Sequence, residues 1–342
     1  MSGGIAQLVA VGAQDAHLVG QPEVSFFRSN YKRHTNFAQT VERQVIQGNP
    51  STGGMSTVRF ERKGDMVGYV YIVANDGDKA VKFSPADWVN AISKVELLVG
   101  GQVIDEQTSQ FSQYIAPSVL AQNLTKSTSG FAEAAESKFY PLRFSFCENA
   151  QTAIPLIALQ YHDVELRITW GTISTEKYEV YSQFIHLDTD ERTALSSTPQ
   201  NMLITQTQKS VASASKTQEI NFNHPVKYLV MFNHKIDDIS SASKLKLQIN
   251  GTDVTDFKNC EPHFTTAPLY YHTQNGKVDS ALILIPFCLD TSKIQPTGSL
   301  NFSRLDSARI LCDNRSFDYP VYGINYNILR IENGMGGLMY SN

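Results

Sequence analysis

The chain has 342 residues, 42% of them hydrophobic and 18% charged, and its formal net charge is −4. This composition is typical of a soluble globular protein with room for two domains, and the charge excludes a global attraction to nucleic acid. The sequence contains no apolar run near the roughly 20 residues of a membrane-spanning helix, and no basic segment with an apolar core that would mark a secretory signal.

The first residues predict a short helix, and the densest basic cluster of the chain follows it. This cluster is interleaved with aromatic residues and consists of Arg28, Lys32, Arg33 and His34 among Phe26, Phe27, Tyr31 and Phe37. One interpretation is an arm that contacts phosphate groups or an acidic partner. The other is the solvated end of a strand whose aromatic neighbours belong to the core.

Alternation of apolar and polar residues dominates the rest of the chain and predicts β-strands. In residues 164–170 (VELRITW) every second side chain is apolar, as in a half-buried strand. Residues 69–73, 228–232 and 322–331 are enriched in β-branched and aromatic residues, which also favour strands. Turn sequences separate these segments, and Asn250-Gly251 predicts a tight hairpin because both residues tolerate positive φ. The pattern indicates an antiparallel sandwich or barrel.

Helical periodicity is scarce, so we expect few and short helices. Beside the N-terminal one, the sequence predicts a turn after Pro85 and a helix at residues 132–136. Helices of this kind belong in the loops of a β-protein.

Two stretches of the chain occur twice in the same order. Residues 93–101 (SKVELLVGG) return as residues 243–251 (SKLKLQING) at an offset of 150, and residues 146–147 (FC) return as residues 287–288 at an offset of 141. Both pairs are predicted to lie in strands. A repeat of this length is far longer than solenoid units of about 20–50 residues, so it predicts two copies of a whole domain fold.

The boundary between the copies is predicted near residue 210. Residues 205–217 are rich in Ser, Thr, Gln, Ala and Lys, a composition that suits a linker. We therefore assign residues 1–210 to an N-terminal arm with the first domain, and residues 211–342 to the second domain with a C-terminal tail. The Gly-rich segment 334–337 lacks the GK[ST] of a phosphate-binding loop and is expected to be a flexible or docked tail.

Cysteine and histidine spacing gives no sign of catalysis or metal binding. The cysteines Cys147, Cys260, Cys288 and Cys312 form no CxxC pair, and we expect small buried hydrophobic residues or, as the alternative, a disulfide. The eight histidines show no HxH or HExxH spacing. Strand alternation places His162 on the opposite face from Asp163 and Glu165. No catalytic residue, cofactor or metal ligand is predicted.

Several ordered blocks resemble one family. Residues 3–15, 33–38, 155–164, 222–227, 295–306 and 325–337 are similar to segments of the major capsid proteins of nucleocytoplasmic large DNA viruses. The resemblance implies an all-β fold of two tandem eight-stranded antiparallel jelly-roll sandwiches with a few short helices in loops. It also implies a structural virion protein, not an enzyme, that trimerises into pseudo-hexagonal capsomers and tiles an icosahedral shell.

The same resemblance implies the partners and the location of the chain. They are two further copies in a homotrimer with heterologous contacts, neighbouring capsomers, and minor capsid proteins beneath the shell, with no sequence-specific nucleic acid. The location is the virion, assembled in the host cytoplasm. On this interpretation the basic arm lies on the inner face. The second half is compact, which leaves glycan attachment and receptor contact without support.

Four N-x-S/T triplets begin at Asn123, Asn250, Asn301 and Asn314. We expect them to be unmodified, because assembly in the cytoplasm bypasses the secretory machinery and two of the triplets lie in a predicted turn or strand.

Two alternatives to the major subunit stay open at this point. One is a minor or vertex-associated capsid component of the same virus class, which would differ in copy number per particle. The other is a tandem carbohydrate-binding β-sandwich protein, which would need an exposed aromatic platform and often carries a secretion signal.

Overall fold

The computed structural model describes residues 3–77, 79–127, 137–173, 176–232, 243–276 and 281–341. The chain divides into two compact units, Met1–Asn36 and Phe37–Asn342. The first unit carries the short helices α1 (Gly3–Gln7) and α2 (Ala16–Val19), joined through a 3-10 turn at Ala13–Asp15. The expected N-terminal helix is thus present as two short ones.

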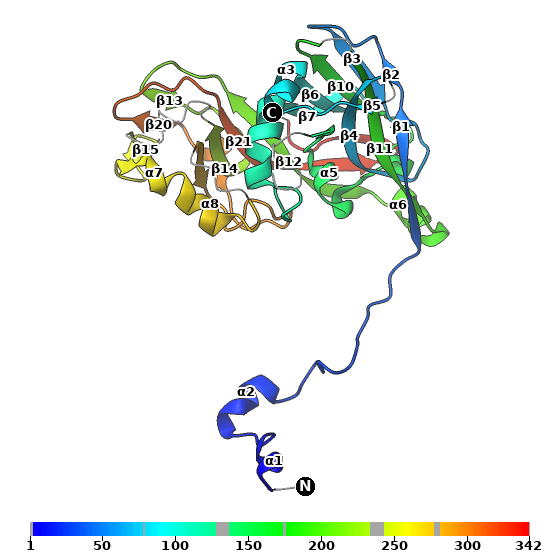
Figure 1. Cartoon of the computed structure of the whole chain (residues 1–342), viewed down its shortest axis with the longest axis vertical. Coiled ribbons are helices and arrows are strands. Elements are labelled where there is room, and N and C mark those ends of the chain that lie inside the picture. The colour runs from blue at the N-terminus through cyan, green and yellow to red at the C-terminus, as the bar shows by residue number, and fades with distance from the viewer. Residues whose placement is uncertain are drawn as a thin grey trace. The chain divides into compact units, whose positions relative to one another are not determined.

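The second unit begins with a pair of antiparallel sheets, called here the first jelly roll (Figure 1). The six-stranded sheet has the order β1-β11-β4-β5, with β8 and β9 also paired to β4. Its strands are β1 (Phe37–Gln44), β4 (Met66–Asp76), β5 (Lys79–Ala80), β8 (Phe139–Pro141), β9 (Ile154–Pro155) and β11 (Lys177–Leu187). The five-stranded sheet has the order β2-β3-β10-β6-β7. Its strands are β2 (Ile46–Gln47), β3 (Met55–Arg59), β6 (Ile92–Val99), β7 (Gln102–Thr108) and β10 (Val164–Trp170).

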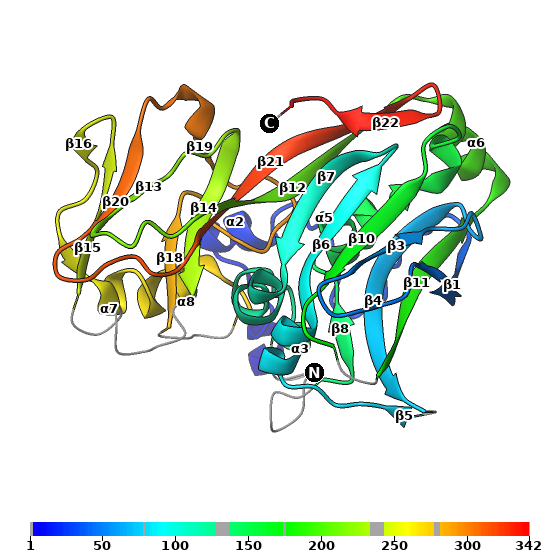
Figure 2. The same ribbon diagram turned by 90° about the horizontal axis from the view of Figure 1, so that it is seen from above.

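A second pair of antiparallel sheets follows, called here the second jelly roll (Figure 2). Its six-stranded sheet has the order β12-β21-β14-β18, and β19 and β22 pair with β14 and β21. These strands are β12 (Gln200–Ser210), β14 (Pro225–Phe232), β18 (Leu282–Pro286), β19 (Leu300–Asn301), β21 (Val321–Glu332) and β22 (Met335–Leu338). The other sheet has the order β13-β20-β15-β16, with β17 paired to β15. Its strands are β13 (Thr217–Glu219), β15 (Lys244–Ile249), β16 (Thr252–Asp253), β17 (Lys258–Asn259) and β20 (Ala308–Cys312).

The two jelly rolls repeat one strand order. Strands that hold the same position along each half also hold the same position in the sheets. In the six-stranded sheets, β1, β11, β4 and β8 of the first half correspond to β12, β21, β14 and β18 of the second. In the other sheets, β3, β10, β6 and β7 correspond to β13, β20, β15 and β16. The first sequence repeat therefore marks equivalent strands, β6 and β15. Both are followed by two residues with positive φ, namely +58° and +82° at Gly100 and Gly101 and +49° and +77° at Asn250 and Gly251. These values are those of the predicted tight hairpins.

The second sequence repeat marks equivalent places but not strands. Cys147 lies in the short helix α5 (Ser145–Glu148), and Cys288 lies in a bend directly after β18. The expectation that both cysteines sit inside strands is wrong, because in each half the chain leaves the sheet shortly before this pair. All four cysteines are free thiols.

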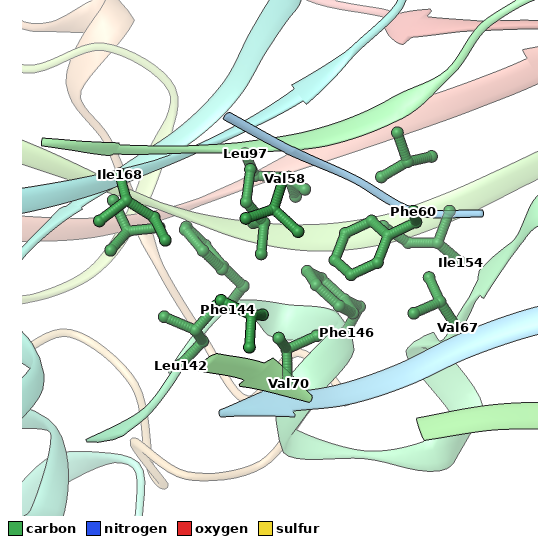
Figure 3. Close-up of a cluster of buried hydrophobic side chains, with 14 of the residues drawn as sticks. Val58, Phe60, Val67, Val70, Leu97, Leu142, Phe144, Phe146, Ile154 and Ile168 are labelled. Carbon is green, nitrogen blue, oxygen red and sulfur yellow. The ribbon is translucent and has the colours of Figure 1, made fainter. Parts of the chain in front are cut away.

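Each sandwich is filled by its own apolar core. In β10 burial alternates residue by residue, as the sequence predicted. Figure 3 shows Phe144 and Phe146 between Val58 and Leu97 of one sheet and Val70 of the other. Burying an aromatic side chain of this size stabilises the fold by about 1.5–3 kcal/mol. Ile220, Leu247 and Ile310 belong to the separate core of the second jelly roll.

The two jelly rolls are joined by shared packing as well as by the chain. Ile204 of β12 and Leu329 and Ile331 of β21 are buried in the core of the first jelly roll. Conversely, the helical segment Phe111–Val119, a π-turn (Phe111–Ile115) followed by α4 (Ala116–Val119), packs on the second jelly roll in a third apolar cluster. Figure 2 shows this teal segment between the two pairs of sheets.

The linker expectation is wrong for most of its length. Gln200–Ser210 is strand β12, which pairs along its whole length with β21, and β13 already begins at Thr217. A polar composition misled here because β12 is half-buried and its glutamines and threonines are hydrogen-bonded. The domain boundary near residue 210 stays a prediction, and the pairing of β12 favours a point before residue 200.

The helices are short, as expected, and only some were foreseen. Helix α3 (Pro85–Ala91) starts after Ser84, whose hydroxyl accepts a hydrogen bond from Asp87 N in a capping box. The segment Phe111–Val119, α6 (Thr189–Ser197) and α8 (Thr266–His272) were not predicted. The helix expected at residues 132–136 falls outside the described residues. Within the described ranges, no helix is long and apolar enough to cross a membrane.

Candidate assembly surfaces

The N-terminal unit exposes both its basic and its aromatic side chains. Arg28, Lys32, Arg33 and His34 are all exposed and lie in a segment without regular structure. Phe26 and Phe27 are 95% and 101% exposed. These aromatic side chains therefore do not belong to a core. The role of the four basic residues as an arm that meets phosphate or acidic groups stays a prediction.

The outer face of the six-stranded sheet in the second jelly roll, the face turned away from its own core, is covered. Tyr228, Leu284 and Tyr322 point to this side and are at most 2% exposed. Their cover is the segment Phe111–Val119 of the first jelly roll together with Leu269 of α8. Tyr114 stacks on Phe232 with ring centroids 4.8 Å apart, and the Thr108 hydroxyl lies 2.8 Å from Tyr322 Oη. An apolar sheet face is thus buried within one chain.

The outer face of the equivalent sheet in the first jelly roll carries an aromatic patch that is partly exposed in the described part of the chain. Tyr69 and Phe139 are 42% and 40% exposed. Tyr71 stacks on Tyr181 with centroids 5.5 Å apart and contacts Phe139 edge-on at 5.7 Å. Tyr69, Tyr71 and Phe139 line a groove of about 640 Å³ that is also lined by Phe146, Cys147 and Gln183. We call it the sheet groove.

Charged side chains line one wall of the sheet groove. The Arg143 Nε atom lies 2.6 Å from Glu148 Oε1, and Lys126 Nζ lies 3.1 Å from Glu148 Oε2. Arg143 and Glu148 are 5% and 10% exposed in their side chains. Burial raises the pKa of the Cys147 thiol, so this groove residue is a poor nucleophile. The groove therefore offers aromatic contact area and a paired charge, with no reactive group.

A second exposed aromatic pair lies on α8 of the second jelly roll. Pro268 and Leu269 are buried under this helix, whereas Tyr270 and Tyr271 are 73% and 76% exposed. The end of the helix is attached to the segment after β18, because His272 Nδ1 lies 2.9 Å from Cys288 O. Two neighbouring tyrosines are thus presented to solvent on a fixed element.

Two buried ionisable side chains lie where the halves meet or near it. Asp105 accepts hydrogen bonds from Thr207 N at 2.8 Å and from Gln107 Nε2 at 3.2 Å, and its burial raises its pKa to about 7. Lys227 donates to Thr291 O and Lys293 O at 3.0 and 3.1 Å, and its burial lowers its pKa to about 8. The sequence had singled out neither residue.

His162 and Asp163 have different partners, as expected from the sequence, although both lie just before β10 and not within a strand. His162 Nδ1 lies 2.9 Å from Gly336 O of β22, whereas Asp163 Oδ2 lies 2.8 Å from Arg59 Nη2. The Gly-rich tail is therefore docked, on the first jelly roll. Among the described residues, no group of three His, Cys, Asp or Glu side chains is arranged to hold a metal.

All four asparagines of the N-x-S/T triplets are exposed, and the side-chain oxygen of each accepts a hydrogen bond. Asn123 Oδ1 accepts from Lys126 N, Asn250 Oδ1 from Asp306 N, and Asn301 Oδ1 from Ser303 N. Asn314 lies after β20. Their modification state stays a prediction.

Comparisons with known proteins agree with this architecture along nearly the whole chain. A family model of the major capsid protein N-terminus matches residues 25–229, and one of the large eukaryotic DNA virus major capsid protein matches residues 238–337. The chain belongs to this capsid protein family. It is a structural protein of the viral capsid and not an enzyme, which removes the carbohydrate-binding alternative.

Two relatives in this family match this chain over its full length. The major capsid protein of Pyramimonas orientalis virus is 32% identical, and that of Paramecium bursaria Chlorella virus 1 is 28% identical, each over the full length of both chains. A chain of the quasi-atomic PBCV-1 capsid superimposes with a TM-score of 0.78 at 25% identity, covering 93% of this chain and 100% of the other. The Faustovirus major capsid protein has the same fold, with a TM-score of 0.62 at 11% identity and 94% coverage of both chains.

The sequence missed the residues that form the uncovered surfaces. The pattern predicts a strand at Tyr69 and Tyr71 but gives no role to their side chains, and it predicts neither the position of Phe139 nor α8. One signal was available. Tyr69 and Tyr71 alternate with Val70, so both aromatic rings lie on one face of this strand.

Proposed function

We propose that three copies of this chain form a pseudo-hexagonal capsomer, and that such capsomers tile an icosahedral capsid. The observation that carries this proposal is the repeated strand order, β1-β11-β4-β8 and β12-β21-β14-β18. One chain supplies two similar wedges, and three chains supply the six that a hexagonal site needs. Closing the ring requires heterologous contacts between the first jelly roll of one chain and the second of the next.

The test is the mass of the full-length protein in solution. Native mass spectrometry and light scattering are expected to give three times the chain mass of 38.1 kDa. An obligate interface of this kind buries more than about 2,000 Å², so the trimer is expected to persist on dilution to nanomolar concentration. A protein that stays monomeric at every concentration and salt contradicts the proposal.

The exposed N-terminal unit supports a second part of the proposal. Arg28, Lys32, Arg33 and His34 lie within seven residues, outside the body that starts at Phe37. We infer that this arm lies on the inner face of the shell and binds acidic surfaces of minor capsid proteins there. Assembly in the host cytoplasm belongs to the same proposal, and unmodified Asn123, Asn250, Asn301 and Asn314 are consistent with it.

A further inference from the structure

The way one chain buries its second six-stranded sheet indicates how a neighbouring chain buries the first. We propose that α8 of one chain packs into the sheet groove of a second copy, with Tyr270 and Tyr271 as the principal contacts. This inference rests on the proposed trimer and names its contact residues. It makes the interface between chains a near copy of the interface within a chain.

Strands β4 and β14, which lie at equivalent places in the two six-stranded sheets, turn equivalent residues outward. In β4 the outward residues of 69–73 are the first, third and fifth, and in β14 those of 228–232 are the same three. Val70 and Leu229, the second residues, both point into their own cores. The aligned pairs are Tyr69 with Tyr228 and Tyr71 with Val230. An equivalent face therefore looks outward in each jelly roll.

The flanking strands extend this equivalence. Tyr71 pairs with Tyr181 of β11 and with Pro141 of β8. Its counterpart in the second sheet pairs with Tyr322 of β21 and Leu284 of β18. Each outer face therefore carries an apolar row across three strands, which is buried in the second jelly roll and partly exposed in the first.

The cover of the second sheet also has an equivalent. Phe111–Val119 lies between β7 and β8, and α8 lies between β17 and β18, the same point in the strand order. Extending the offset of 150 from the preceding hairpins aligns Val119 with Leu269, and both are buried in the same apolar cluster. The next position is the half-buried Leu120 in the first half and the exposed Tyr270 in the second. A helix thus follows the equivalent strand in each half. Both helices contribute to the cover of the second sheet through Val119 and Leu269, and α8 in addition turns Tyr270 and Tyr271 to solvent.

A second copy of the chain suits the groove in chemistry as well as in place. The exposed aromatic area of Tyr69 and Phe139 matches the aromatic side chains of α8, and tyrosine is enriched at the buried centres of protein interfaces. The Lys126–Glu148 pair at the wall can receive phenolic hydroxyls. The exposed phenylalanines of the N-terminal unit are the competing occupant of the groove.

Cross-linking tests the contact directly. The variant Gln183→Cys/Tyr271→Cys, in a Cys147→Ala background that removes the native groove thiol, is treated with a short bismaleimide at trimer concentration. Two-chain and three-chain products are expected on a denaturing gel. The matched control Gln183→Cys/Val211→Cys replaces an 81% exposed loop residue instead and is expected to stay single-chain. Stronger linkage of Gln183→Cys to Phe27→Cys than to Tyr271→Cys overturns the proposal in favour of the arm.

Disruption tests whether the contact matters for assembly. Tyr270→Asp/Tyr271→Asp is expected to raise the trimer dissociation constant by about tenfold or more, because buried aromatic anchors dominate interface energetics. Circular dichroism controls for folding, and Val211→Asp is expected to leave the dissociation constant unchanged. If the wild type is a trimer but the cysteine variant does not cross-link and the double aspartate variant keeps the wild-type dissociation constant, the α8 contact alone is overturned. A wild-type monomer overturns the trimer itself and this contact with it.

Discussion

At the residue scale, polar side chains that the sequence would leave on the surface are buried where the two jelly rolls meet. Gln206 of β12 donates to the carbonyl of Ile104 in β7, and Asp105 accepts from the amide of Thr207. Gln206 also accepts from Asn327 Nδ2 at 2.9 Å. Buried polar groups with satisfied hydrogen bonds fix one geometry, since any displacement leaves donors or acceptors unpaired. These bonds therefore set the orientation of the two halves.

Asp105 predicts a pH dependence of stability. Its pKa of about 7 in the folded protein lies above the value of about 3.9 for an unfolded chain. The folded state therefore favours the protonated acid, and the free energy of unfolding falls as pH rises from about 4 to about 7, by at most about 1.4 kcal/mol per pH unit for this group. Asp105→Asn is expected to flatten this dependence, measured by urea unfolding at pH 5, 6, 7 and 8.

The exposed residue Asp256 provides the control. Asp256→Asn is expected to keep the wild-type slope over the same pH range. Equal slopes in wild type and Asp105→Asn contradict the assignment.

The burial of Asp105 could not be predicted from the sequence. The segment Gln102–Thr108 is polar at most positions and resembles an exposed hairpin strand. It becomes buried because β12, about 100 residues later, packs against it. Alternation reports only the two faces of a strand within its own sandwich, so it predicted the burial of β10 and not that of Asp105.

At the element scale, strands were predictable where one face is polar and the other apolar. Residues 164–170 match β10 at both ends, and the hairpins at Gly100-Gly101 and Asn250-Gly251 match their turn chemistry. The sequence did not predict β12, because Ile204 is the one buried apolar residue of this strand. The segment Phe111–Val119 and α8 failed because each is short and contains a proline, and because tertiary packing stabilises them more than helix propensity does.

The hairpin of β21 and β22 depends on glycine. A Cβ atom on Gly336 would lie 2.6 Å from Leu159 Cδ2 and 3.0 Å from Val99 Cγ1. Gly336→Val is expected to lower the free energy of unfolding by about 1–3 kcal/mol, since the overpacked hairpin must move away from the first jelly roll. Thermal unfolding measures the change.

Gly337→Ala is the matched substitution in the same strand. Its Cβ would meet only Gln102 Oε1 at 3.1 Å, the end of a flexible side chain. A small change is therefore expected. Equal losses in the two variants would show that the strand, and not its contact with Leu159, is sensitive.

At the scale of the whole molecule, the N-terminal arm and the body are expected to separate in function. The triple variant Arg28→Glu/Lys32→Glu/Arg33→Glu removes the positive charge that attracts acidic partners, so shells are expected to form less efficiently or to lose their inner-layer proteins. The solution trimer is expected to be unchanged. Particle yield and inner-protein content, measured by electron microscopy and mass spectrometry of purified particles, test this.

The corresponding glutamine variants remove the charge without reversing it and are expected to give an intermediate loss. Particles of normal yield and composition from the glutamate variant rule out the arm hypothesis. The arm could be located from the sequence because its basic residues are closely spaced. Its binding partner could not be identified, because four positive charges indicate only that the partner is negatively charged.

The repeat and the ordered family blocks together predicted most of the architecture. They predicted two jelly rolls in one chain, and the family comparisons agree. They did not predict that strands of the second jelly roll reach into the core of the first. Sequence repeats report what two copies share, whereas Ile204, Leu329 and Ile331 belong to what joins them.

This shared core has a consequence for synthesis on the ribosome. The first jelly roll lacks three of its buried side chains until β12 and then β21 have been made, and β21 is among the last elements of the chain. A nascent N-terminal half therefore exposes apolar surface until β21 has been made. Chains that stop before β21 leave that surface open, so they are expected not to form assembly-competent subunits.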